Sequence, residues 1–115
     1  MYHKDLEAWK EAINFVTKIY TITNNFPKSE IFGLTSQIRR CVVSVPSNIA
    51  EGCARFSDKE TARFLDIALG SIAELETQLI ISKNLNYIDN LDGLLSELKR
   101  INALTLGVKK YLNKK

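Results

Sequence analysis

Apolar side chains recur every three or four residues along most of this chain, which is the period of an α-helix. Four such segments follow one another, at about 5–24, from between 29 and 34 to 55, from 58 to between 84 and 86, and from 89 to the end. No stretch alternates in the manner of a strand. Because helices joined by short connections pack as antiparallel neighbours, the pattern predicts an all-α, antiparallel up-down-up-down four-helix bundle. The 115 residues are expected to form one domain, 1–115.

Each segment carries one main apolar stripe, and these stripes are the predicted core. In chain order the expected core residues are Leu6, Trp9, Ile13, Val16 and Tyr20; Leu34, Ile38, Val42, Val45 and Ile49; Phe64, Ala68, Ile72, Leu75 and Leu79; and Leu91, Leu94, Leu95, Leu98, Ile101, Leu104, Val108 and Leu112.

Residues that favour helix ends punctuate the four segments. Asp5 and Asp89 are suitable N-caps for the first and last segments, and Ser57 with Glu60 forms a capping-box pattern ahead of the third. Pro46 lies inside the second segment, and a proline there removes a backbone hydrogen bond. The periodicity resumes after it, so we expect one helix kinked at Pro46 rather than two helices.

The second and third segments are apolar over more than one stripe. On a helical wheel the second segment has an apolar arc of about 200°, and the third is wider, with Ile67, Ile81 and Leu85 on one flank. This width predicts a subunit interface, although a tightly wrapped monomer with scattered surface aliphatics would give the same pattern. The residues expected at the interface are Val43, Pro46, Ala50, Cys53, Leu69, Ala73 and Ile80.

Charge and cysteine content indicate an ordinary cytoplasmic protein. The 16 basic and 13 acidic side chains give a net charge of +3, which is only weak evidence for a nucleic-acid partner. Cys41 and Cys53 are separated by about 18 Å if they share a helix, which is too far for a disulfide, and we expect both to be reduced. The N-terminus does not resemble a signal peptide, and no apolar run is long enough to span a membrane.

No residue pattern typical of catalysis or metal binding is present. Di-iron sites in helical bundles use Glu-x-x-His motifs on two helices, whereas the only histidine here is His3. Ser44, Ser47 and Ser71 have no histidine nearby in the sequence to act as a base, and neither do the cysteines. We therefore expect no enzyme activity, no metal and no cofactor.

Cationic side chains gather in the sequence around the second helix and the start of the third. This group is Arg39, Arg40, Arg55, Lys59 and Arg63. One hypothesis is that these residues contact the phosphates of RNA or DNA, for which arginine is well suited. The other is that they form ion pairs with Glu51, Asp66 and Glu74 within the bundle or across a subunit contact. The lysine-rich C-terminus is a second candidate basic patch, or a solvated helix end.

Several motifs of the chain closely resemble those of the four-helix bundle proteins encoded in intervening sequences of bacterial 23S ribosomal RNA genes. The resemblance extends from about residue 6 to residue 88, and the fourth segment adds only its apolar pattern. The matching motifs are Phe26-Pro27, Gly33–Arg40, Ser44–Gly52, Arg63-Phe64-Leu65, Gly70-Ser71 and Glu74–Leu79.

This resemblance implies a four-helix bundle assembled as a ring-like homopentamer. The chain is also similar to the accessory variability protein of diversity-generating retroelements, which implies a nucleic acid and a reverse transcriptase as possible partners. A pentamer would carry a formal charge of about +15, enough for long-range attraction to phosphate. Two functional hypotheses follow: a non-enzymatic oligomer that binds RNA or DNA, or a protein-interaction scaffold that binds no nucleic acid.

Overall fold

The computed structural model describes all 115 residues and contains four α-helices and no strand. They are α1 (Glu7–Thr23), α2 (Leu34–Cys53), α3 (Asp58–Asn84) and α4 (Leu91–Asn113), with short 3-10 turns η1 (His3–Asp5) and η2 (Lys28–Glu30). The predicted all-α fold with four helices is confirmed. None of these helices combines the length and the apolar character needed to cross a bilayer.

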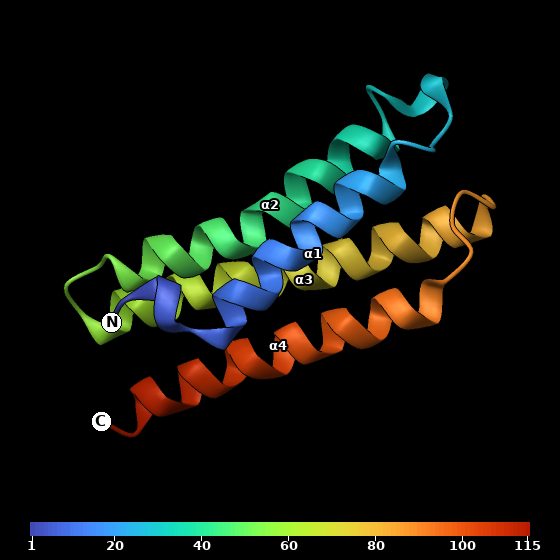
Figure 1. Cartoon of the computed structure of the whole chain (residues 1–115). Coiled ribbons are helices and arrows are strands. Elements are labelled where there is room, and N and C mark those ends of the chain that lie inside the picture. Colours follow the sequence, from blue (N-terminus) through green and yellow to red (C-terminus); the bar gives the residue numbers. More distant parts are fainter.

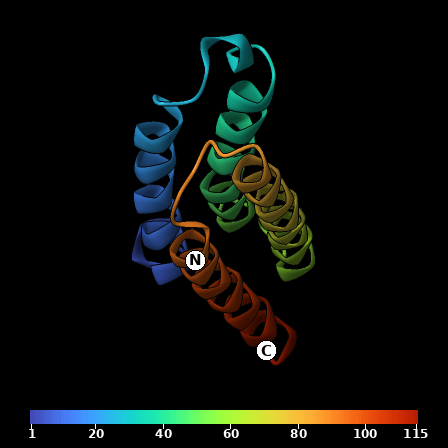
Figure 2. The ribbon, with the colours of Figure 1, turned by 90° about the vertical axis from the view of Figure 1, so that its right-hand side faces the viewer.

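The helices pack as a closed cycle in which each contacts two neighbours. α1 packs on α2 and α4, α3 packs on the same two helices, and the backbones of the diagonal pairs do not approach closely. Figure 1 shows the chain running along α1, back along α2, forward along α3 and back along α4. In Figure 2, α1 and α3 lie on opposite sides of the bundle, and α4 lies across from α2. The molecule measures 47 × 25 × 20 Å.

Side-chain contacts between α1 and α4 agree with this order. Lys18 pairs with Glu97, whereas the earlier residue Glu11 pairs with the later residue Arg100 at 2.6 Å. Residue numbers therefore increase along α1 in the direction in which they decrease along α4. The two ion pairs are exposed, so they contribute at most about 1 kcal/mol each.

The predicted core is confirmed for most of α2, α3 and α4 and is partly wrong for α1. Phe64 of α3 and Leu95 of α4 were expected in the core, but both are half-buried and lie outside it. Ile38, Val42, Val45 and Ile49 of α2 are all buried, as is most of the α3 stripe. On α1 the buried residues are instead Ala8, Ala12, Phe15, Ile19 and Thr23.

The stripe expected on α1 is rotated relative to the face that is buried. Ile13 and Tyr20 are 38% and 40% exposed, although both were predicted core residues. The small side chains of Ala8 and Ala12 face the core, where they allow the neighbouring helices to approach closely. A pattern that weights large apolar residues overlooks such positions.

The helix ends follow the predictions only in part. The Ser57 hydroxyl accepts a hydrogen bond from the Glu60 amide at 3.1 Å, which confirms the cap of α3. The cap of α4 is Asn90 rather than Asp89, because the Asn90 side chain is the one that reaches the Gly93 amide, at 3.0 Å. α1 has no side-chain cap, since Asp5 is part of η1.

Pro46 lies within α2, which is continuous from Leu34 to Cys53. Side chains on either side of the proline bond to backbone carbonyls: the Ser44 hydroxyl donates to Cys41 O at 2.6 Å and the Asn48 amide donates to Ser44 O at 2.8 Å. One helix rather than two is therefore correct, and the kink at Pro46 stays a prediction.

Candidate functional site

The five cations predicted to contact nucleic acid do not form one surface. Arg39 and Arg40 lie in the first third of α2, whereas Arg55, Lys59 and Arg63 lie around the connection from α2 to α3. Fifteen residues of helix separate Arg40 from Arg55, which corresponds to about 22 Å. The structure thus divides the cluster into two groups toward opposite ends of the molecule.

Arg39 is a structural side chain that joins α2 to the C-terminal end of α1. Its Nε donates to Thr23 Oγ1 at 2.8 Å, and its Nη2 donates to Asn24 Oδ1 at 2.9 Å. The guanidinium also lies 4.7 Å from the centroid of the Tyr20 ring. A cation here is favourable because the carbonyl end of a helix carries partial negative charge.

Arg55 and Arg63 both lie against the ring of Phe64. Their guanidinium carbons are 4.7 and 4.6 Å from the ring centroid. Arg55 also pairs with Glu51, and Arg63 pairs with Glu60 at 3.1 Å. The hydrogen bond from Arg63 lowers the pKa of Glu60 below its usual value. Both arginines are thus ion-paired, but only Glu51 is a partner that the ion-pairing hypothesis named.

Arg40 and Lys59 are the two members of the cluster that are exposed and have no ion pair or side-chain hydrogen bond within the chain. They belong to different groups, so the fold of one chain does not bring these two cations together. Asp66 pairs with Lys109 of α4 at 2.6 Å, not with the arginines.

The residues predicted for a subunit interface fall into three environments. Pro46 and Cys53 are buried inside the chain, and both α1 and η1 pack against α2. Ala50 and Leu69 are half-buried, whereas Val43, Ala73 and Ile80 are exposed. The wide apolar arc of α2 is therefore largely satisfied within one chain.

The apolar surface of α3 stays open. Ile67, Ile80, Ile81 and Leu85 are between 38% and 48% exposed. They lie on the two flanks of a polar strip that includes Thr77, and no other element covers them. An amphipathic helix with this much uncovered aliphatic surface is typical of an association site.

Two phenylalanines that the helical pattern did not single out are almost fully exposed. Phe32 is 95% exposed in the connection before α2, and Phe56 is fully exposed in the connection before α3. Ile31, beside Phe32, is also exposed. Sequence reasoning followed helical periodicity, which gives no information about side chains in connections. The occurrence of Phe at a turn, where polar residues are usual, was the available signal.

Neither thiol is placed as a nucleophile. Cys41 is buried, its Sγ donates to Ser71 O at 3.1 Å, and burial raises its pKa to about 11. Burial also raises the pKa of Cys53. The ring of His3 contacts Trp9 and Tyr2, at centroid distances of 5.2 and 5.4 Å. No cluster of three or more His, Cys, Asp or Glu side chains is arranged to hold a metal ion.

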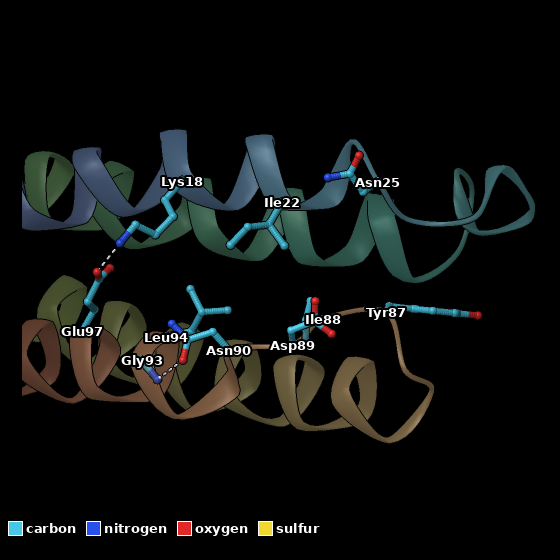
Figure 3. Close-up of a pocket in the computed structure, with 10 residues that line it drawn as sticks. All are labelled: Lys18, Ile22, Asn25, Tyr87, Ile88, Asp89, Asn90, Gly93, Leu94 and Glu97. Atoms are coloured by element: carbon cyan, nitrogen blue, oxygen red, sulfur yellow. Dashed lines mark hydrogen bonds and ion pairs between the residues drawn. The ribbon is translucent and has the colours of Figure 1, made fainter.

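A pocket of about 490 Å³ lies between α1 and the connection that leads into α4 (Figure 3). Its apolar lining comes from Ile22, Ile88 and Leu94, and the Lys18–Glu97 ion pair crosses it. The Tyr87 hydroxyl donates to Glu30, at 3.0 Å. This hydrogen bond raises the pKa of Tyr87 above its usual value. Both Lys18 and Tyr87 are therefore engaged with a carboxylate of the chain.

The comparisons with known proteins identify a family and a fold. The family model described as 23S rRNA-intervening sequence protein matches residues 4–107. No curated protein matches the chain. A crystal structure of a protein of unknown function from the S23 ribosomal protein family of Bacteroides thetaiotaomicron is similar over 90% of this chain and 95% of its own, with a TM-score of 0.81 and 23% identity. The chain therefore belongs to the 23S rRNA-intervening sequence protein family.

Proposed function

We propose that this protein is a non-catalytic module that assembles with further copies of itself and serves as a helical scaffold. The observation that carries the proposal is the uncovered aliphatic surface of α3, formed by Ile67, Ile80, Ile81 and Leu85. A pentamer is the state that the family resemblance implies.

The distribution of exposed apolar residues supports a subunit contact on α3. Single exposed aliphatics are normal on a monomer. Here, however, Ile80, Ile81 and Leu85 follow one another within two turns, at the end of the bundle where the connection from α1 to α2 also lies (Figure 1). Burying such side chains yields about 25 cal/mol per Å² of apolar surface, so a subunit contact that covers both flanks of the polar strip would stabilise an oligomer appreciably.

The arginine contacts favour a scaffold over nucleic-acid binding by the original cluster. Arg39, Arg55 and Arg63 are all engaged within the chain, by hydrogen bonds, ion pairs and aromatic rings. Binding phosphate through them would mean giving up these contacts. RNA or DNA binding through Arg40 and Lys59, and docking of a protein partner such as a reverse transcriptase, stay predictions.

Light scattering coupled to size-exclusion chromatography tests the proposal. Ile81→Glu and Ile80→Glu should each shift the wild-type oligomer toward monomer, because a buried charge is costly at an apolar contact. Ile13→Glu on α1 is the matched control: Ile13 and Ile80 are both 38% exposed. The control should leave the mass unchanged. A monomeric wild-type protein at micromolar concentration overturns the proposal, and equal loss of assembly in all three variants overturns the role of α3.

A further inference from the structure

The net positive charge of this chain comes from its last 18 residues. Residues 98–115 contain six lysines and arginines and no acidic residue, which gives a net charge of +6. The preceding 97 residues contain 10 basic and 13 acidic side chains and are net negative, at −3. The net charge of +3 is therefore the sum of −3 from residues 1–97 and +6 from residues 98–115, most of which belong to α4.

Three of these six cations have no ionic partner within the chain. Lys99, Lys110 and Lys114 are exposed and form no ion pair. The other three pair with acids of other elements: Arg100 with Glu11, Lys109 with Asp66 and Lys115 with Asp58, at distances of 2.6, 2.6 and 3.5 Å.

The three unpaired lysines lie on one side of α4. At 100° per residue they fall within an arc of about 60°, on the side away from the core residues Leu94 and Leu98. Lys110 follows Lys99 by about 16 Å along the helix, and Lys114 follows Lys110 by about 6 Å. The free lysines thus form a line, which we call the α4 lysine strip (Lys99, Lys110 and Lys114).

The residues between these lysines are small. Ala103 and Gly107 are both exposed, and a Cβ added at Gly107 would meet no atom within 4 Å. Glu76 of α3 lines a shallow pocket with Lys99 but does not pair with it, and Asp92 lies on the same side of α4 about two turns before Lys99. An extended ligand could therefore lie along the helix without meeting bulky side chains.

The helix dipole explains only part of this arrangement. Cations stabilise a helix when they lie in its last turn, as Lys110 and Lys114 nearly do. Lys99 is about four turns from the end of α4 and gains nothing from that effect. Its alignment with the other two points to a ligand that is itself a line of negative charge.

We propose that the α4 lysine strip binds the phosphate backbone of a nucleic acid. Lysines contact phosphates as compact charges, and such contacts carry no sequence information. These lysines belong to α4, whereas the arginine groups lie on α2 and around the connection from α2 to α3. The binding goes beyond the scaffold role and does not depend on it.

Fluorescence anisotropy with labelled RNA, as a single strand and as a duplex, tests the strip across a salt series. The variant is Lys99→Gln, Lys110→Gln and Lys114→Gln combined. The control combines Arg40→Gln, Lys59→Gln and Lys28→Gln, which removes three cations outside α4 that are likewise exposed and unpaired. The strip variant and the control variant each lose three positive charges. Circular dichroism and thermal melting confirm that each is folded.

Wild-type protein should bind both RNAs with an affinity that falls as salt rises. The strip variant should bind at least about tenfold more weakly, with a log–log salt slope for the duplex that is smaller by about 2 to 3, while the control stays close to wild type. Equal losses in both triple variants would mean that only net charge matters and would overturn the site. Wild-type binding to polyglutamate but not to RNA would identify an acidic protein as the occupant and overturn the proposal. Absence of binding to either RNA at low salt overturns it as well, whatever the oligomeric state.

Discussion

The guanidinium of Arg39 and the hydroxyl of Thr23, 2.8 Å apart, join the beginning of α2 to the end of α1. Thr23 is buried and also donates to Ile19 O at 2.8 Å, so its hydroxyl serves both as donor and as acceptor. The neighbouring cation, Arg40, has no partner in the chain. Adjacent arginines in one sequence motif therefore have different roles.

Replacing Arg39 by Ala should lower the free energy of unfolding by about 1 to 3 kcal/mol, because charged hydrogen bonds to buried partners are lost. Arg40→Ala, the matched control, should change it by less than about 0.5 kcal/mol. Urea denaturation followed by circular dichroism measures both values. Equal effects of the two substitutions would show that Arg39 does not stabilise the α1–α2 contact.

Two glycines of the helices should respond to alanine in opposite directions. Gly107→Ala should raise the free energy of unfolding by about 0.5 to 1 kcal/mol, since alanine favours a helix and the added methyl meets nothing. Gly52→Ala should be destabilising, because its Cβ would lie 2.9 Å from Phe64 Cβ and 3.1 Å from Thr61 O. Thermal unfolding of both variants checks the signs, and stabilisation by Gly52→Ala would contradict the close packing of α2 against α3.

The N-cap of α4 can be located by mutation. Asn90→Ala should cost about 1 kcal/mol, because the Gly93 amide loses its acceptor. Asp89→Ala should cost less, since the Asp89 side chain caps nothing. The comparison uses chemical denaturation of the two variants. A larger loss of stability for Asp89→Ala than for Asn90→Ala would show that Asp89 is the N-cap, as the sequence pattern indicated.

The Cys41 thiol should make the protein less stable in alkaline solution. Its pKa is raised from 9.0 to about 11 in the folded state, so the folded protein retains a proton that the unfolded chain releases. Stability from this effect is complete below pH 9 and is lost as pH rises toward 11. Cys41→Ala should reduce the slope of stability against pH in that window. An unchanged slope would show that other groups, such as Cys53 and Tyr87, dominate it.

The thiols should also be protected from modification at neutral pH. Both cysteines are buried, so a thiol reagent should react at the rate of unfolding rather than at the rate seen for an exposed thiol. Reaction kinetics with and without denaturant distinguish the two cases. Fast reaction of Cys53 in the native protein would indicate that the N-terminal segment near it opens readily.

The sequence by itself determined the four helices and most of the core. Local periodicity and few breakers specify where helices form, and the stripes of α2 and α3 are long enough to identify their buried faces. The cap at Ser57 was readable because it depends on residues three positions apart. The buried face of α1 could not be read from the sequence, because Ala8 and Ala12 face the core for reasons of helix spacing rather than hydrophobicity.

Only the tertiary structure decided which of the surface residues are free. The sequence placed five cations in one cluster, but their availability depends on partners that are distant in the chain, such as Thr23 for Arg39. It likewise gave both α2 and α3 wide apolar arcs, and the chain itself largely covers that of α2. Helix formation is a local property, whereas the exposure and pairing of a side chain depend on every element that packs around it.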